Sequence, residues 1–268
     1  MLAVEELQEI VEVALFSGRL AGERPLSLLV IADVGSGKSE LLAHYPEHLN
    51  ATVLYVNDIT AFALHKHHGK ELREGKIRHI ILGDLLTPLN KQKEQADAFI
   101  TFMNGVIEEG LARVESRDSC FIADVPVRCG LVTSIARQDF ETRHTRWATV
   151  GFLSRLLPIS YSYSQDTILQ VFDYIIHGRY ATDKPIALWL PGSDVSVDLP
   201  IDIARELIPL TQRLKDSEDT YGFRRLKQLQ VWVKAHALYR GRHVVTRDDL
   251  ARLFELSVYM NRRCEKQL

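Results

Sequence analysis

The sequence predicts an α/β fold, in which helices cover both faces of a parallel β-sheet and a smaller, all-helical region follows. Short apolar runs of strand length alternate with segments whose apolar residues recur at helical spacing, the pattern of strands joined by crossover helices. The first run ends in a glycine-rich turn, which is typical of a buried parallel strand. Near Gly178 this pattern ends, and helical segments follow. We therefore expect a core over residues 1–180 and a helical domain over residues 181–268.

Each expected strand is a short apolar run, and each expected helix carries apolar residues along one side. The expected strands are 26–32, 52–56, 77–83, 129–134 and 158–163, with 120–123 as one arm of a hairpin. The expected core helices are 4–16, 39–45, 60–75, 91–114 and 147–157. A proline-containing connection then leads to helices at 201–215, 223–239 and 246–263. Thr246 followed by Asp249 is a helix-starting pair for the last of these.

The composition is that of a globular protein with a substantial core. Of the 268 residues, 46% are hydrophobic and 25% are charged, and the formal net charge is −2. Any contact with nucleic acid must therefore come from a local basic patch, because the overall charge does not favour it. The cysteines, Cys120, Cys129 and Cys264, include no C-x-x-C pair, which argues against a disulfide framework and against a zinc site.

The first apolar segment carries glutamates, unlike a signal peptide, and no uninterrupted apolar stretch is long enough to span a bilayer. The few cysteines suit a reducing compartment. We expect a cytoplasmic protein with no membrane partner.

A phosphate-binding motif follows the first expected strand. The pattern G-x-x-x-x-G-K-[ST] appears at residues 32–39, with Ala32 in place of the first glycine. Glycines let successive backbone N–H groups point inward and cradle phosphate oxygens. Lys38 is expected to reach the β- and γ-phosphates, and the Ser39 hydroxyl to ligate Mg²⁺. The expected nucleotide-binding residues are Val34, Gly35, Ser36, Gly37, Lys38 and Ser39. ATP is the expected nucleotide, because a guanine-specific N-K-x-D signature is absent.

A second acidic site is expected at the end of a neighbouring strand. ATPases with such a phosphate-binding loop need a carboxylate at this strand end to hold Mg²⁺, directly or through water. Asp84, after the apolar run 80–83, is the best candidate, and Asp124 is the alternative. Many such ATPases follow this aspartate with a glutamate that polarises the attacking water. Here Leu85 follows, so either another residue performs that task or hydrolysis is slow.

With a phosphate loop, an acidic strand end and a helical C-terminal region, the chain resembles AAA+ ATPases, and the resemblance extends over nearly all of it. The C-terminal region is similar to the lid of minichromosome-maintenance-type (MCM) helicases and related loaders. The matching residues are Arg224-Arg225-Leu226, Ala235-His236-Ala237, Arg240 and Val245-Thr246-Arg247-Asp248-Asp249. The resemblance implies a three-layer α/β/α core, a helical lid, and an oligomeric ring, most often of six subunits.

The resemblance also implies roles for particular side chains. Arg224 would be the sensor-2 arginine, which reaches the γ-phosphate in its own subunit, with Arg225 as the alternative. Gly151-Phe152-Leu153-Ser154-Arg155-Leu156 resembles the segment that carries the arginine finger, so Arg155 would contact ATP bound to a neighbouring subunit. Arg143 and Arg146 compete for that role. Thr133 or Ser134, near the end of the expected strand 129–134, would be sensor 1, which orients water.

Several other patterns carry less information. Residues 65–78 are locally basic, and so is the segment with Arg137, Arg143, His144 and Arg146; either can contact a phosphate backbone or be a solvated surface. Tyr161 and Tyr163 are expected to pack within the protein and not to stack on bases. The leading hypothesis is an ATP- and Mg²⁺-dependent AAA+ motor or loader that acts on DNA, directly or through a DNA-binding partner protein. The alternatives are a protein-remodelling ATPase and a slowly hydrolysing assembly switch.

Overall fold

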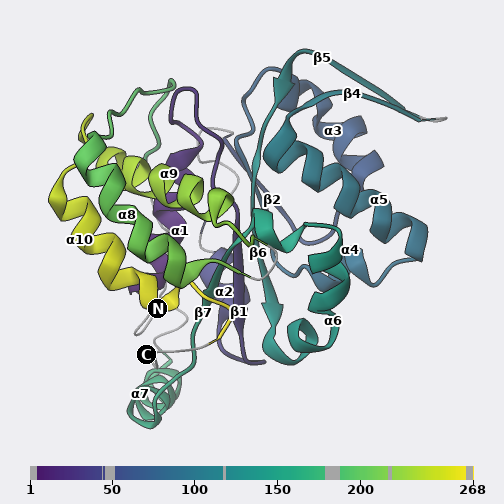
Figure 1. Ribbon diagram of the computed structural model, residues 1–268. Coiled ribbons are helices and arrows are strands. Elements are labelled where there is room, and N and C mark those ends of the chain that lie inside the picture. The colour runs from purple at the N-terminus through teal and green to yellow at the C-terminus, as the bar shows by residue number, and fades with distance from the viewer. Residues whose placement is uncertain are drawn as a thin grey trace.

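The computed structural model describes residues 5–43, 45, 52–116, 119–178, 188–216, 219–263 and 268. At its centre lies a five-stranded sheet in the order β2-β3-β6-β1-β7, in which every pair of neighbours is parallel (Figure 1). The strands are β1 (Leu28–Ala32), β2 (Val53–Val56), β3 (His79–Leu82), β6 (Gly130–Ala136) and β7 (Leu157–Ser160). All residues of β1, β3 and β7 are buried, which explains why these strands appear in the sequence as continuous apolar runs.

Helices cover both faces of the sheet, as the sequence predicts for an α/β fold. The side chains of β1 alternate between two apolar cores: Leu28, Val30 and Ala32 belong to one, and Leu29 and Ile31 to the other. The first core also contains residues of α1 (Glu5–Ser17) and α2 (Lys38–Ala43). The second contains or contacts residues of α3 (Ala61–Arg73), α4 (Leu86–Leu89), α5 (Lys93–Asn104) and α6 (Arg137–Thr149).

The C-terminal region is helical, with α8 (Ile201–Leu214), α9 (Phe223–Tyr239) and α10 (Arg247–Leu256), followed by a 3-10 turn at Ser257–Tyr259. These helices pack beside α1, on the left in Figure 1, and their apolar side chains belong to the same core as α1. Thr246 and Asp249 form the capping box at the start of α10 that the sequence indicates. Whether residue 180 divides two domains stays a prediction.

Two expected helices are too long at their C-terminal ends. The helix expected over 246–263 ends at Leu256, where a 3-10 turn follows. The prediction of a helix over 91–114 is wrong at its C-terminal end, because α5 and a π-helical turn, Gly105–Glu109, end at Gly110. Gly110 has φ 84° and ψ 129°, a backbone conformation that favours glycine and that ends the helix. The chain continues as β4 (Leu111–Ser116), which pairs antiparallel with β5 (Ser119–Val127) in a separate hairpin. The expected hairpin arm at 120–123 lies within β5.

The expected helix over 147–157 is also displaced. Helix α6 covers Arg137–Thr149, a 3-10 turn covers Leu153–Arg155, and β7 begins at Leu157. Gly151, with φ 69°, separates the helix from the turn. The sequence did not indicate α7 (Gln165–Ile176), which projects from the body at the bottom of Figure 1. Among the described residues, no helix is long and apolar enough to cross a membrane.

Candidate nucleotide-binding site

The glycine-rich loop lies where its motif requires, between the end of β1 and the start of α2. Gly35 and Gly37 have φ values of 78° and 77°, which side chains with a Cβ rarely adopt. A Cβ at Gly35 would meet nothing within 4 Å, so the glycine serves the backbone conformation and not side-chain packing. Val34, at the tip of the loop, is 83% exposed. The tip of the loop therefore faces solvent, whereas Ser36 in its middle is buried.

Lys38 folds back over the loop. Its Nζ donates hydrogen bonds to the carbonyl oxygens of Ala32, at 3.0 Å, and Asp33, at 2.6 Å. Partial burial lowers the pKa of Lys38, while the negative charges of Asp33 and Asp84 act in the opposite direction. An ammonium group that is held by two carbonyl oxygens at the mouth of the loop can exchange them for phosphate oxygens.

Two tyrosines that follow β7 bind the glycine-rich loop through their hydroxyl groups. The hydroxyl groups of Tyr161 and Tyr163 both donate hydrogen bonds to the carbonyl oxygen of Ser36, at 2.9 and 2.8 Å. They can do so because β7 lies beside β1, with Ile31 opposite Ser160. The sequence favoured packing for these residues and gave no sign of the hydroxyl contacts. The two hydrogen bonds fix the position of Ser36, in the middle of the loop, relative to the end of β7.

Asp84 follows β3 at the carboxyl edge of the sheet, the same edge as the glycine-rich loop. Its side chain is exposed, and Oδ1 accepts a hydrogen bond from the backbone N–H of Leu86, at 2.9 Å. Its charge acts on Lys38, so the two groups are within electrostatic reach of each other. Leu85 is fully buried in the second core. Asp124, the alternative, lies exposed on β5, which belongs to the separate hairpin and not to the sheet.

The adjacent residues Thr133 and Ser134 point to opposite sides of β6 and differ in their partners. The Ser134 hydroxyl donates to the carbonyl oxygen of Gly83, at 2.6 Å, and its carbonyl oxygen accepts from Leu85, at 2.9 Å. Ser134 thus binds the residues on both sides of Asp84. The Thr133 hydroxyl is buried and has no hydrogen-bond partner among the described residues.

Arg137 is a residue of this site that the sequence reasoning assigned only to a basic segment. Its Nε lies 3.3 Å from Asp33 Oδ1, and Nη2 donates to the carbonyl oxygen of Tyr161, at 3.1 Å. Its position one residue after β6 was the available signal, because β6 is the strand next to β1. The carboxyl edge therefore brings together Lys38, Asp84, Arg137 and the loop.

The oxygen donors at this edge suit Mg²⁺ together with phosphates. The Ser39 hydroxyl is exposed in the first turn of α2, and the Asp84 carboxylate is exposed after β3. Mg²⁺ is typically bound by one or two protein oxygens, with waters and phosphate oxygens completing its octahedron. Within the described part of the chain, no cluster of three or more His, Cys, Asp or Glu side chains could hold a metal ion.

A second group of charged residues lies at the opposite, amino edge of the sheet. Arg155 precedes β7, whose first residue, Leu157, lies opposite Leu28, the first residue of β1. Arg155 Nε lies 2.8 Å from Oε2 of Glu108, and Nε of Arg224 lies 2.9 Å from Oε1 of the same carboxylate. Arg24 Nη1 approaches Oε1 at 3.4 Å. We call Arg24, Arg155 and Arg224 the arginine cluster.

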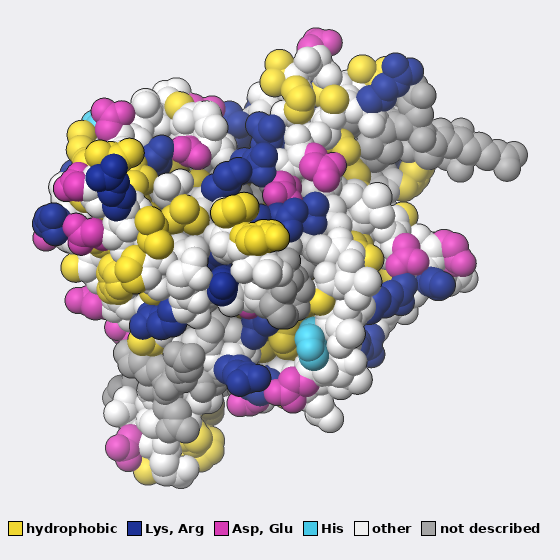
Figure 2. Space-filling view, in the orientation of Figure 1, with side chains coloured by type: hydrophobic (Ala, Val, Ile, Leu, Met, Phe, Trp, Pro, Cys, Tyr) yellow, Lys and Arg dark blue, Asp and Glu magenta, His cyan; other side chains and the backbone are white. Residues whose placement is uncertain are grey.

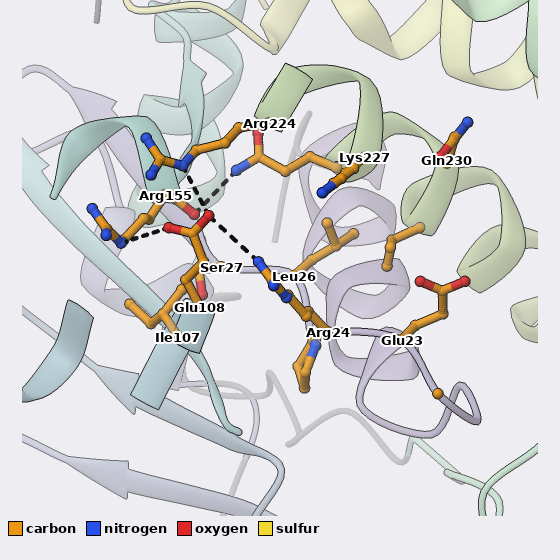
Figure 3. Close-up of a pocket in the computed structure, with 14 residues that line it drawn as sticks. Glu23, Arg24, Leu26, Ser27, Ile107, Glu108, Arg155, Arg224, Lys227 and Gln230 are labelled. Carbon is orange, nitrogen blue, oxygen red and sulfur yellow. Dashed lines mark hydrogen bonds and ion pairs between the residues drawn. The ribbon is translucent and has the colours of Figure 1, made fainter. Parts of the chain in front are cut away.

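The arginine cluster lines a cavity of about 320 Å³ between the core and α9. Figure 3 shows the three arginines converging on Glu108 from separate elements, with Lys227 nearby. On the face drawn in Figure 2, Lys and Arg side chains gather between the C-terminal helices and the hairpin, with Asp and Glu among them. The length of β1, about 15 Å at ~3.3 Å per residue, separates this edge from the glycine-rich loop.

The competing arginines have other partners. Arg225, the alternative to Arg224, is 1% exposed and bonds Asp216, Gln228 and the carbonyl oxygen of Leu214. A buried side chain with all these partners is part of the fold. Arg143 and Arg146 are exposed on α6 and bond Asn90 and Asp97. Arg224, not Arg225, therefore accompanies Arg155.

No protein-family model matches this chain, and no curated protein matches it.

Proposed function

We propose that this protein is an ATP-binding and ATP-hydrolysing AAA+ protein of the P-loop NTPase class. The observation that carries the proposal is the carboxyl edge of the sheet, where one loop contains Lys38 and two glycines with positive φ, and the exposed carboxylate of Asp84 lies within electrostatic reach of Lys38. Successive N–H groups of such a loop bind phosphate, and Lys38 binds the β- and γ-phosphates. Strand order and helices on both faces are compatible with a three-layer α/β/α core.

In this proposal Ser39 and Asp84 hold Mg²⁺, which draws charge from the β- and γ-phosphates when it is bound. Tyr161 and Tyr163 keep the loop in place through Ser36. Ser134 holds the backbone around Asp84, and Arg137 supplies the polar group next to the phosphates that the sequence led us to expect from Thr133 or Ser134. Arg137 would release Asp33 in order to contact phosphate.

The arginine cluster acts on the ATP of a second subunit. Arg155 was expected to act in this way, whereas Arg224 was expected to reach the ATP of its own subunit. Their common partner, Glu108, lies at the edge opposite to Lys38, which supports assigning both arginines to a neighbour's nucleotide. A guanidinium stabilises the charge that develops during phosphoryl transfer. This arrangement requires a homo-oligomer, and a closed ring is its simplest form.

Slow hydrolysis is a second possibility that one observation favours. Leu85 fills the position where a glutamate would polarise water, and it is fully buried, so this position cannot supply a base. A protein with the same site would then be an ATP-dependent assembly switch. Turnover well below about 1 s⁻¹ would fit this form, because typical enzymes turn over between 1 and 10³ times per second.

DNA is the substrate that we propose for the motor or loader. The similarity of the C-terminal region to helicase lids supports it, as do the exposed cationic side chains of Lys66 on α3 and Arg143 on α6, whose hydrogen-bond partner Asn90 is uncharged. Salt-dependent binding is expected from contacts to phosphates.

The test is the rate of ATP hydrolysis with and without single- and double-stranded DNA, with Lys38→Ala as the blank. We expect hydrolysis in the wild type, stimulation by DNA, and at least a tenfold loss in Lys38→Ala. Hydrolysis that DNA does not change would favour a protein-remodelling ATPase. If the wild type neither binds MgATP nor exceeds the blank, the proposal is wrong.

A further inference from the structure

One carboxylate holds the arginine cluster together. Glu108 lies at the end of the π-helical turn after α5, and its two oxygens contact guanidinium groups from three segments: the loop before β1, the turn before β7 and the first turn of α9. The three guanidinium groups carry like charges and repel one another. The negative charge of Glu108 between them offsets this repulsion. Figure 3 shows Glu108 at the point where the three side chains meet.

Hydrogen bonds to the turn before β7 fix two of the three arginines, Arg155 and Arg224, further. Arg155 Nη1 donates to the carbonyl oxygen of Gly151, at 2.6 Å, and Arg224 Nη1 donates to Ser154 Oγ, at 2.9 Å. Ser154 Oγ in turn donates to Gly151 O, at 3.0 Å. Arg224 is thus held by two hydrogen bonds, from Nε to Glu108 and from Nη1 to this turn, whereas Arg155 is held by its Nη1 hydrogen bond to the turn and by an ion pair, without a hydrogen bond, between Nε and Glu108. Because the guanidinium group is planar, the two hydrogen bonds of Arg224 define its plane.

The arginines around Glu108 favour the ionised form of its carboxylate. Burial alone would raise the pKa of Glu108, but the hydrogen bond from Arg224 and the charges of Arg155 and Arg24 outweigh it and lower the pKa. The side chains of Glu108 and Arg155 are 18% and 11% exposed. Arg155 and Glu108 therefore interact in a partly dehydrated environment, where the ion pair is stronger than on an open surface.

We propose that Glu108 is the positioning residue of the arginine cluster: it holds Arg155 and Arg224 in the orientation in which they meet the phosphates of ATP bound to a neighbouring subunit. Glu108 does not touch that ATP and acts through the two arginines. The inference rests on the proposed function, and it assigns to Glu108 a role beyond attaching α9 to the core. A displacement of about 1 Å in such a group can lower the rate about a hundredfold.

The variant Glu108→Gln keeps the shape of the side chain and removes its charge. We expect kcat for ATP hydrolysis to fall about ten- to a hundredfold, while the isolated subunit binds MgATP with unchanged affinity. The matched control is Glu109→Gln, because Glu109 is adjacent and exposed and its Oε1 lies 3.6 Å from Arg155 Nη2, farther than Glu108 lies from Nε. Glu109→Gln is expected to keep kcat within about twofold of the wild type. If Glu108→Gln does not fold, Glu108→Asp, which withdraws the charge by one methylene, is the substitute.

Mixing subunits identifies the site on which Glu108 acts. Glu108→Gln mixed with Lys38→Ala is expected to regain hydrolysis, because some sites combine an intact loop with an intact arginine cluster. Glu108→Gln mixed with Arg155→Ala is expected to stay at the low rates of the two unmixed variants, because every arginine cluster is then defective. The opposite pattern would place the effect of Glu108 at the loop of its own subunit and would overturn the inference.

The reference mixture, Lys38→Ala with Arg155→Ala, separates this inference from the proposed function. If it regains activity while Glu108→Gln alone retains wild-type kcat and loses only thermal stability, Glu108 is a structural ion-pair residue and the inference alone fails. If the wild type does not hydrolyse ATP, or if the reference mixture stays inactive although the wild type is active, the shared site itself is wrong and the inference falls with it.

Discussion

Asp84 owes its position to hydrogen bonds made by a neighbouring strand. Ser134 accepts from Leu85 and donates to Gly83, so both flanks of Asp84 are fixed to β6, the strand beside β1. Thr133, one residue earlier, has a hydroxyl with no partner among the described residues. The sequence could only offer these two residues as equivalent polar candidates, because alternation along a strand does not reveal which backbone atom lies opposite each hydroxyl. Because only Ser134 has hydrogen-bond partners, removing its hydroxyl and removing that of Thr133 are expected to affect stability differently.

Ser134→Ala is expected to lower the free energy of unfolding by about 1–3 kcal/mol, because the buried Gly83 carbonyl loses its side-chain partner. It should also weaken Mg²⁺-dependent ATP binding, since Asp84 loses part of its support. Denaturant unfolding and calorimetric titration with MgATP measure the two effects.

The matched control, Thr133→Val, is expected to leave stability within about 0.5 kcal/mol of the wild type or to raise it, because an isosteric methyl replaces an unpaired hydroxyl. Its ATP hydrolysis should also be unchanged. A large loss of hydrolysis in Thr133→Val, with stability intact, would return the sensor role to Thr133 and remove it from Arg137.

At the scale of the elements, β3 and β6 approach each other through a buried histidine. His79 is fully buried; burial lowers its pKa to about 4, so it is neutral near pH 7. Its Nε2 lies 3.0 Å from the carbonyl oxygen of Leu26. A Cβ at Gly130 would lie 2.4 Å from the ring of His79 and 2.6 Å from Leu26 O. The strands pair at their observed positions only because residue 130 has no side chain.

Gly130→Ala is therefore expected to destabilise the protein by about 3 kcal/mol, because the added methyl meets a backbone oxygen and a fully enclosed ring that cannot move aside. Gly192→Ala is the matched control, since a Cβ there meets nothing within 4 Å, and its effect should stay within about 0.5 kcal/mol. Thermal and denaturant unfolding of both variants measure the difference. Equal stability of the two variants would mean that β3 and β6 are not packed as described.

The sequence predicted the strands of the sheet well because they are short and mostly buried, so that they appear as continuous apolar runs. It failed where helical periodicity continued through a break. Leu111 extended the apparent pattern of α5, although Gly110 had already ended the helix. The segment after Trp147 looked helical, whereas the helix itself begins at Arg137 among polar residues with few buried side chains. Tertiary pairing decided both cases.

At the scale of the whole molecule, the C-terminal helices share a core with α1. Trp232 of α9 is fully buried, and Lys234 and Tyr239 of the same helix contact Glu23 and Glu12. The amphipathic patterns predicted these helices but not the surface on which they pack. That surface decides the position of Arg224, because it brings the start of α9 to Glu108 at the amino edge. Sequence similarity could name Arg224 as a candidate, but only the fold shows that it lies at the amino edge beside Arg155 and not beside the loop with Lys38.

The two edges of the sheet thus carry complementary halves of one proposed site. In the proposed function, the loop with Lys38 receives an arginine from a neighbouring subunit in addition to its own Arg137, because the arginine cluster of the same subunit lies at the opposite edge of the sheet. A single subunit would then bind ATP with little hydrolysis, and assembly would switch hydrolysis on. Neither half should be active alone.

The most direct test of this claim is ATP turnover per subunit as a function of protein concentration, for the wild type and for Arg155→Ala, with Lys38→Ala as the blank. The wild type is expected to show turnover that rises steeply with concentration and then levels off as subunits assemble, while Arg155→Ala binds ATP but stays near the blank at every concentration. Turnover per subunit that does not depend on concentration, equal in the wild type and Arg155→Ala, would contradict a site shared between subunits.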